Sequence, residues 1–405
     1  MPLFTILSSI SRELLDAIFF DYRFLPVYIF IALIIRLKYQ RYLEFESNVY
    51  GQPLRTPRGI IEEMLFTGLS AGFVKSIVVV LLKITLDIRV FEYMLVILVI
   101  LALINARYAC MSYAGGILAL LAVFFRLSNV DVPSVLILVA VLHMLESILI
   151  FVSGSKDPIP VYIKHSDGIT GAFLMRKFWP VPVVFLTFLS GDAAGSEAVY
   201  KGAFALGMDC IIGMLGYSDM AVTKRPEDKS RESAVRFFCY SVLLLAIGIM
   251  SARYTAFKVI GAVFSVLAHE AVVLFNRYCE RSGEPAYTPV KRGLRVLDVL
   301  PGSHAFKMGI KRGDIILGIN GRAIQTEDGM KAALKDFPAF LWIDILDING
   351  LAKTYEYRCY PEGLNELGLV TIPREKEITY NIENFDDLVI LKNLVARFRS
   401  INKPV

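Results

Sequence analysis

Residues 293–321 read GLRVLDVLPGSHAFKMGIKRGDIILGING, a compact pattern of apolar runs separated by turn residues. The turn signals fall at residues 301–302, 309, 312–314 and 320–321. Asn-Gly after an alternating apolar run is among the stronger turn signals in a sequence. The pattern predicts strands at 294–300 and 315–319 and a short helical turn at 303–308. A small, water-soluble α+β unit is therefore expected here.

The composition of the whole chain differs from that of this stretch. Of 405 residues, 55% are apolar and 20% charged, and the mean hydropathy is +0.55. These values are too high for an ordinary soluble protein. Long apolar runs fill the sequence before about residue 280, and charge and turns dominate after it. The net charge of +5 is small, and we expect no nucleic-acid partner.

The five cysteines lie far apart, with no CxxC and no metal-ligand spacing. Most fall in or beside apolar runs, where a free cysteine behaves as a small hydrophobic residue. The sequence therefore predicts no disulfide framework, no metal site and no cofactor.

Apolar runs recur along residues 1–280 and predict a polytopic membrane domain. Residues 1–20 contain charges and predict an interfacial helix. The runs lie at 24–35, 65–86, 91–106, 110–125, 133–152, 178–190, 199–217, 237–251 and 256–275. A spanning helix needs about 20 apolar residues, so we expect about seven to nine crossings. Residues 153–177 form a polar linker between these runs.

Basic segments predict the orientation of the chain, because cytoplasmic loops accumulate Lys and Arg. These segments lie at 36–58, 153–177, 224–236 and 277–292. The C-terminal unit is then expected on the cytoplasmic side of a bacterial plasma membrane. The orientation is the same whether both or neither of the segments 178–190 and 199–217 cross the membrane. It reverses if only one of them crosses.

The soluble part continues beyond the opening stretch. Residues 327–336 predict a helix, with Thr326 as its N-cap and acidic residues in its first turn. Two β-rich runs flank Asn349-Gly350 and predict a hairpin. The soluble unit is expected at 285–364. The extension 365–405 is expected to add a short strand and an amphipathic helix.

Candidate catalytic residues are few. His269-Glu270 begins as a zinc-protease HExxH motif does, but residue 273 is Val where a second His is required. Ser218 follows Gly216-Tyr217 as in an intramembrane serine protease, but Asp219 takes the place of a small residue. His143 and Glu146 share a helix face within an apolar run and, like His269 and Glu270, have no role that the sequence assigns. We therefore expect no catalytic residues.

The order of strands and turns around residues 293–321 resembles a bacterial PDZ domain. The resemblance places the carboxylate-binding loop and the groove strand at the start of this stretch and the facing helix at 327–336. In such a groove a peptide adds as an extra strand. The implied peptide-binding residues are Arg292, Gly293, Leu294, Arg295, Val296, Leu297, Met330, Ala333 and Leu334. Ordinary core packing is an equal alternative for Met330 and for Leu334.

A polytopic N-terminal part joined to one PDZ-like domain resembles the MinJ family, membrane proteins that position cell division in Gram-positive rods. Residues 160–173 and 176–182 are also similar to the central segment of that family. The resemblance implies a non-catalytic scaffold that bridges DivIVA-type and MinD-type proteins. The alternative is an intramembrane protease, or a regulator of one, that senses peptide ends. The oligomeric state stays open, as does the choice between a C-terminus and an internal strand as ligand.

Overall fold

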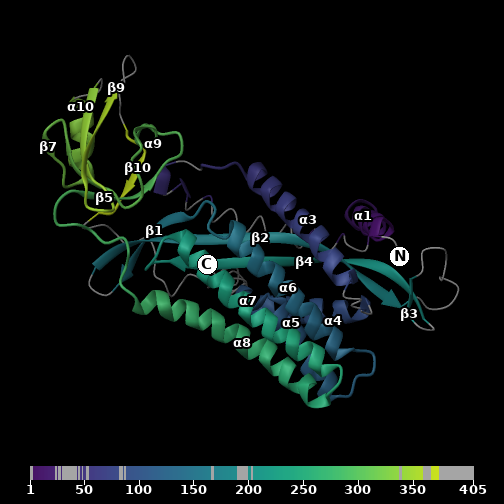
Figure 1. Cartoon of the computed structure of the whole chain (residues 1–405). Helices are drawn as coiled ribbons and strands as arrows, with labels where there is room; N and C mark the ends of the chain where they lie inside the picture. Colours follow the sequence, from purple (N-terminus) through teal and green to yellow (C-terminus); the bar gives the residue numbers. More distant parts are fainter. Residues whose placement is uncertain are drawn as a thin grey trace, which may run out of the picture.

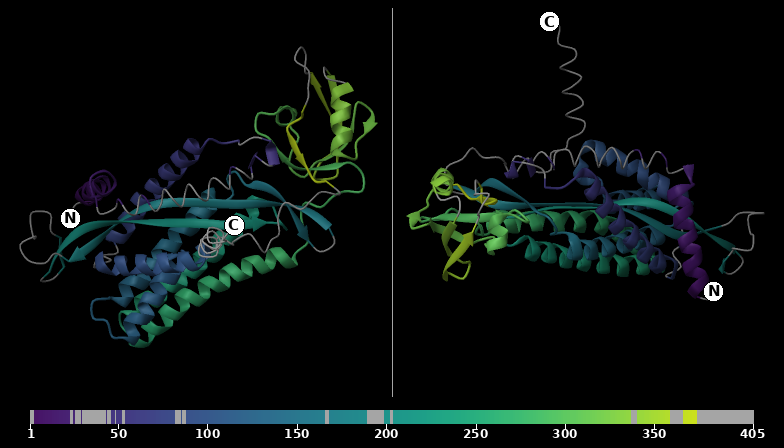
Figure 2. Two further views of the ribbon diagram at one scale, coloured as in Figure 1. Left: turned by 180° about the vertical axis from the view of Figure 1, so that it is seen from behind. Right: turned by 90° about the horizontal axis from the view of Figure 1, so that it is seen from above.

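The computed structural model places an elongated helical and β-sheet body beside a smaller β-rich unit (Figures 1 and 2). The residues that it describes are 3–22, 25, 29, 43, 46–47, 49–51, 54–81, 85, 88–165, 168–188, 199–201, 204–336, 340–358 and 366–373.

Seven helices of more than one turn are described in the body. They are α1 (Leu3–Phe19), α3 (Pro57–Leu81), α4 (Ile88–Ile104), α5 (Met111–Phe124), α6 (Val132–Ser153), α7 (Pro226–Ser251) and α8 (Thr255–Ser282). Their starts follow local rules. Asp131, for example, caps α6 by accepting a hydrogen bond from the Ser134 amide, and Pro133 occupies its first turn.

Four of the described helices, α3, α6, α7 and α8, are long and apolar enough to cross a membrane. Helix α5 is apolar but has only 14 residues. The predicted span 24–35 and the predicted C-terminal amphipathic helix 385–398 lie outside the described residues, apart from single positions in the first. The described part of the chain therefore supports fewer crossings than the expected seven to nine.

The sequence left open whether the segments 178–190 and 199–217 span the membrane, and their described residues form strands rather than helices. Most of these residues lie in strands β2 (Gly168–Phe188) and β4 (Phe204–Ala221), which pair antiparallel with Phe173–Phe188 opposite Leu206–Ala221. Strands β1 (Ile159–His165) and β3 (Val199–Lys201) complete a sheet of order β1-β2-β4-β3, so the expected linker 153–177 is also largely strand. A continuous apolar run is typical both of a spanning helix and of a strand buried on both faces.

Helix α3 runs along β2 (Figure 1) and contacts the part of that strand that contains Pro180 and Pro182. A Cβ at Gly68 would lie 2.1 Å from the Pro180 carbonyl oxygen, and a Cβ at Gly72 would lie 2.3 Å from that of Pro182. One step further, Ser76 Oγ accepts a hydrogen bond from the Val184 amide.

The spacing of these contacts is matched on the two elements. Four helical residues rise about 6 Å, and two strand residues rise about 6.6 Å. Proline has no amide hydrogen, so Pro180 and Pro182 leave no donor unpaired on the side of β2 that faces α3. The close contact requires glycine on the helix because any side chain would strike backbone oxygen.

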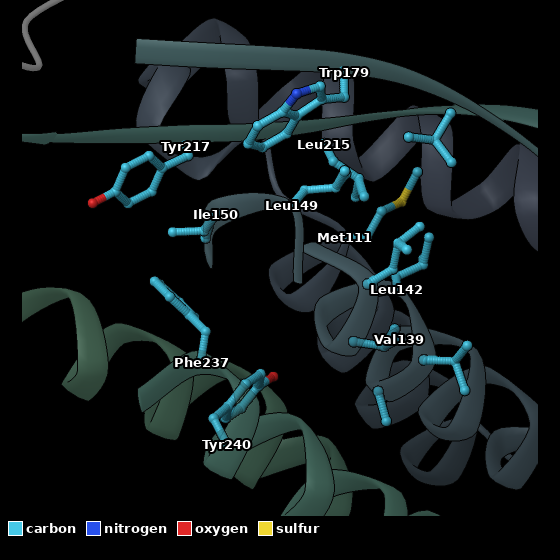
Figure 3. Close-up of a cluster of buried hydrophobic side chains, with 14 of the residues drawn as sticks. Met111, Val139, Leu142, Leu149, Ile150, Trp179, Leu215, Tyr217, Phe237 and Tyr240 are labelled. Atoms are coloured by element: carbon cyan, nitrogen blue, oxygen red, sulfur yellow. The ribbon is translucent and has the colours of Figure 1, made fainter. Parts of the chain in front are cut away.

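The other face of the hairpin packs on the helices. Figure 3 shows Trp179 and Leu215 of the strands together with Met111 and Leu149 from α5 and α6, and Phe237 from α7 nearby. Trp179 is only 2% exposed. The hairpin is thus enclosed between α3 and the remaining helices.

A buried ion network joins β4 to α7 and α8. Lys229 is fully buried, and its Nζ lies 3.4 Å from an Asp219 carboxylate oxygen and 3.5 Å from one of Glu280. Glu280 also accepts hydrogen bonds from the Val222 and Thr223 amides. The network satisfies buried charge that would otherwise be costly.

The C-terminal unit contains the elements predicted around the opening stretch. They are β5 (Leu294–Val299), α9 (His304–Met308), β6 (Ile315–Ile319), β7 (Arg322–Ala323), α10 (Glu327–Asp336), β8 (Phe340–Leu346), β9 (Ala352–Arg358) and β10 (Leu369–Thr371). Ser303 caps α9, and Gly309 ends it with a φ of +87°. The strands follow the order β10-β5-β6-β8-β9, with β7 beside β6.

Substitution of Gly72 by Ala should disrupt the contact between α3 and β2. The added methyl group would overlap the Pro182 carbonyl, and we expect a loss of about 1–3 kcal/mol, typical of overpacking. Gly59→Ala is the matched control in the same helix, because its Cβ would meet only Thr56 Oγ1, at 3.3 Å. Thermal unfolding of the detergent-solubilised protein measures both. Equal unfolding midpoints for the two variants would contradict the close contact between α3 and β2.

Substitution of Lys229 by Met should leave two buried carboxylates without their cation. We expect a destabilisation of about 3–5 kcal/mol. The control is Lys224→Met, since Lys224 is 40% exposed in its side chain and pairs with Glu232, so its loss should cost at most about 1 kcal/mol. The comparison uses unfolding midpoints in detergent, and a smaller effect at Lys229 than at Lys224 would contradict the network.

Candidate functional site

The candidate site lies at the outer strand of the C-terminal sheet. β10 is the terminal strand of the described sheet and pairs antiparallel with β5, with Thr371 opposite Val296. Thr371 Oγ1 donates a hydrogen bond of 2.9 Å to Glu327 at the start of α10. The edge of β10 therefore lies beside the first turn of α10, and a strand edge next to a helix is the usual form of a peptide groove.

The predicted groove strand, Leu294–Leu297 in β5, has partners on both sides. Val296 exchanges backbone hydrogen bonds with Gly313 and Asp314 on one side. On the other, Arg295 accepts a hydrogen bond from the Ile372 amide. In this arrangement a peptide strand adds beside β5 only by displacing a strand that is already there.

Most predicted groove side chains lie in the core of the unit. Those in this core are Leu294, Val296, Met330, Ala333 and Leu334. Leu297 instead packs in the larger core of the helical body, and Arg292 is exposed. The core alternative thus accounts for the burial of Met330 and Leu334, and their role in binding stays a prediction.

Two further predicted residues are constrained by their backbone or burial. Gly293 has a φ of +87°, and a Cβ there would lie 2.5 Å from the Ile316 carbonyl oxygen, so only glycine fits. Arg295 is half-buried, its Nε has no hydrogen-bond partner among the described residues, and burial lowers the pKa of its guanidinium. Gly368 repeats the pattern of Gly293, because it too has positive φ and precedes a Leu that begins a strand.

The C-terminal unit docks on the tip of the β1–β2 hairpin. Tyr162 of β1 donates a hydrogen bond of 2.7 Å to the Thr371 carbonyl, and burial raises the pKa of this phenol, which keeps it a donor. A Cβ at Gly171 of β2 would lie 2.5 Å from Leu297, so the two parts are in close contact. Tyr162 thus uses a backbone acceptor of β10 that an added strand would need.

Asp298 provides the polar part of the docking contact. It is 4% exposed and accepts hydrogen bonds from Tyr50 and from Arg312. The Arg312 guanidinium also lies 4.9 Å from the centre of the Phe173 ring in β2. Burial lowers the pKa of Arg312, but the hydrogen bond and charge of Asp298 outweigh it and raise that pKa overall. Sequence patterns gave no sign of this contact, because its residues are far apart in the chain.

The remaining candidate catalytic residues lie in different surroundings. Glu270 pairs with Arg107 and accepts a hydrogen bond from Tyr113, whereas its neighbour His269 faces Cys110. Ser218 lies within β4 opposite Arg176, as one rung of the strand pair. His143 and His269 come together from α6 and α8, which their sequence spacing could not indicate.

These features define a chain of apolar, potentially membrane-crossing helices with a docked C-terminal β-rich unit. No protein-family model matches it. The chain is similar to the cell division topological determinant MinJ of Bacillus subtilis (strain 168), with 20% identity over 251 residues. The match spans 60% of this chain and 63% of MinJ, which is less than two thirds of that protein. The match supports a distant relationship between this chain and MinJ.

Substitution of Arg312 by Ala should loosen the docking of the C-terminal unit. Asp298 would keep hydrogen bonds from Tyr50 and the Val299 amide but lose its cation, and breaking a buried ion pair costs about 3–5 kcal/mol. We expect faster amide hydrogen exchange in residues 168–173 and 366–373. Lys311→Ala is the control, because that neighbouring side chain is exposed. Unchanged exchange in Arg312→Ala would show that this ion pair does not hold the unit.

Proposed function

We propose that this protein is a non-catalytic membrane scaffold that binds protein partners through a PDZ-like C-terminal unit. The observation that carries the proposal is the edge position of β10 beside α10. A strand edge supplies backbone hydrogen bonds for affinity, and an adjoining helix supplies side-chain selection. The similarity to MinJ supports a role as a topological determinant of the division site.

In this proposal the peptide pairs with the outer edge of β10 rather than with β5. The Gly368-Leu369 turn then takes the place that the sequence had suggested for Gly293-Leu294. Met330, Ala333 and Leu334 shape the helix side of the groove from within the core. Tyr162 competes with the peptide for the Thr371 carbonyl, so binding couples to the docking of the unit.

The proposed setting is the bacterial plasma membrane, crossed several times, with the C-terminal unit on the cytoplasmic side. The basic segments at 224–236 and 277–292 support this orientation. The described residues of 178–190 and 199–217 form strands, which supports an orientation in which neither segment crosses as a helix. Membrane tethering raises the effective concentration of membrane-bound partners, so a weak groove contact suffices.

The proposed partners are a DivIVA-type scaffold and a MinD-type ATPase, bridged by this chain. Their support is the MinJ-like sequence, which points to division-site placement. Bridging requires two contacts, and the structure offers surfaces of two kinds, the C-terminal unit and the helical body.

Binding to purified MinD-type and DivIVA-type proteins tests the proposal, with the full chain held in lipid nanodiscs. Leu294→Asp puts a charge into the core of the C-terminal unit and should abolish binding of at least one partner. Tyr162→Phe frees the Thr371 carbonyl and should tighten that binding about two- to tenfold, the worth of one hydrogen bond. The control Lys331→Ala, on the exposed face of α10, should bind normally.

The outcomes separate the parts of the proposal. Full binding by Leu294→Asp would overturn the role of the C-terminal unit. If Leu294→Asp abolishes binding but Tyr162→Phe does not tighten it, the peptide groove lies elsewhere in the C-terminal unit. Biolayer interferometry gives the affinities for all three variants.

A further inference from the structure

A cluster of three metal-ligating side chains lies inside the helical body. Cys110 precedes α5, His143 lies in α6, and His269 lies in α8. One ligand atom from each falls within 4.8 Å of the other two. Cys110 Sγ is 3.2 Å from His143 Nε2 and 3.6 Å from His269 Nε2. The three residues are far apart in sequence, so only the packing of α5, α6 and α8 creates the group.

The distances suit a tetrahedral metal ion. With Zn–S near 2.3 Å and Zn–N near 2.0–2.1 Å, neighbouring ligand atoms lie about 3.3–3.6 Å apart. Both sulfur–nitrogen distances in the cluster are close to this separation. An ion therefore fits between the side chains after small rotations.

The surroundings of His143 prepare it as a ligand. It is 1% exposed, and its Nδ1 lies 2.9 Å from the Val139 carbonyl oxygen, which accepts only a protonated nitrogen. Nε2 then carries the lone pair that faces Cys110. A carbonyl that fixes the tautomer of a histidine in this way is the usual outer partner of a metal-binding imidazole.

His269 and Cys110 supply the other two ligand atoms. His269 is 7% exposed, and its Nδ1 has no hydrogen-bond partner among the described residues. No hydrogen bond at Nδ1 thus fixes this ring, which instead packs against the rings of Tyr113, Phe237 and Tyr240. The Ser112 amide lies 3.4 Å from Cys110 Sγ at the start of α5 and donates a hydrogen bond to this sulfur.

The nearby charges allow a divalent cation. A Glu146 carboxylate oxygen lies 3.6 Å from His143 Nε2 and can approach the fourth position. Among the cations, Arg107 is paired with Glu270, and the buried Lys75 interacts electrostatically with Glu146. One thiolate, two neutral imidazoles and one carboxylate together balance a charge of +2.

We propose that Cys110, His143 and His269 form a site for a zinc-class divalent ion that clamps α5, α6 and α8 together. Mixed sulfur and nitrogen ligands favour Zn²⁺ and admit Co²⁺ as a spectroscopic substitute. Because each ligand comes from a different segment, binding stabilises the packing of the bundle. The role of the site is structural.

Cobalt titration of the detergent-solubilised full chain tests the site. The wild type should bind about one Co²⁺ per chain, with a sulfur-to-cobalt charge-transfer band and a tetrahedral visible spectrum. Cys110→Ser should lose the sulfur band, and His143→Gln and His269→Gln should each weaken binding more than the 10–100-fold typical of outer-shell changes. The controls Cys239→Ser, an exposed cysteine in α7, and His304→Ala should bind as the wild type does.

X-ray absorption of the zinc-loaded wild type gives a test that needs no variant. We expect one sulfur at about 2.3 Å and two nitrogens at about 2.0–2.1 Å. Chelation should then lower the thermal unfolding midpoint of the wild type and leave that of Cys110→Ser unchanged. A shell of oxygen ligands only, or equal sulfur bands in wild type and Cys110→Ser, would identify an adventitious ion and overturn the proposal.

Discussion

The pairing of backbone polar groups inside an apolar body is the constraint on which this structure depends. A long β-hairpin lies among helices with many of its residues buried, so its buried amides and carbonyls need partners within the protein. Strand β4 satisfies one side of β2. Along α3, prolines remove donors, Ser76 accepts the Val184 amide, and Gly68 and Gly72 let the helix approach. Without that combination the edge of β2 would carry unpaired backbone in an apolar setting.

The same hairpin links the two parts of the molecule. Its far end packs against α1 and α3. At its near end, Gly171 and Phe173 of β2, together with Tyr162 of the neighbouring strand β1, contact the C-terminal unit. The docked unit places its own edge strand against the body. In the proposed function, a partner that pairs with β10 binds at the junction of the two parts, where it competes with Tyr162 for the Thr371 carbonyl. Such coupling would let the docking of the C-terminal unit on the helical body regulate the binding of a partner.

The polar residues of the bundle divide into two kinds. Lys229 with Asp219 and Glu280 forms a closed ion network that is satisfied within the protein. Cys110, His143 and His269 have converging lone pairs and one unsatisfied ring nitrogen. The first kind is explained by packing alone. The proposed ion would complete the second kind by joining its three ligand atoms.

The sequence alone determined the split between an apolar body and a soluble unit, and it located the elements of that unit closely. Local signals were sufficient there, because Ser303, Gly309 and Asn320-Gly321 set caps and turns through their own backbone preferences. The tertiary structure decided what periodicity cannot decide. The described residues of 178–190 and 199–217 form strands, whereas a continuous apolar run is typical both of a spanning helix and of a strand buried on both faces. It also decided that β10 forms the edge beside β5 and that Cys110 meets His143 and His269. Strand order and helix packing join residues distant in sequence, and no local pattern carries that information.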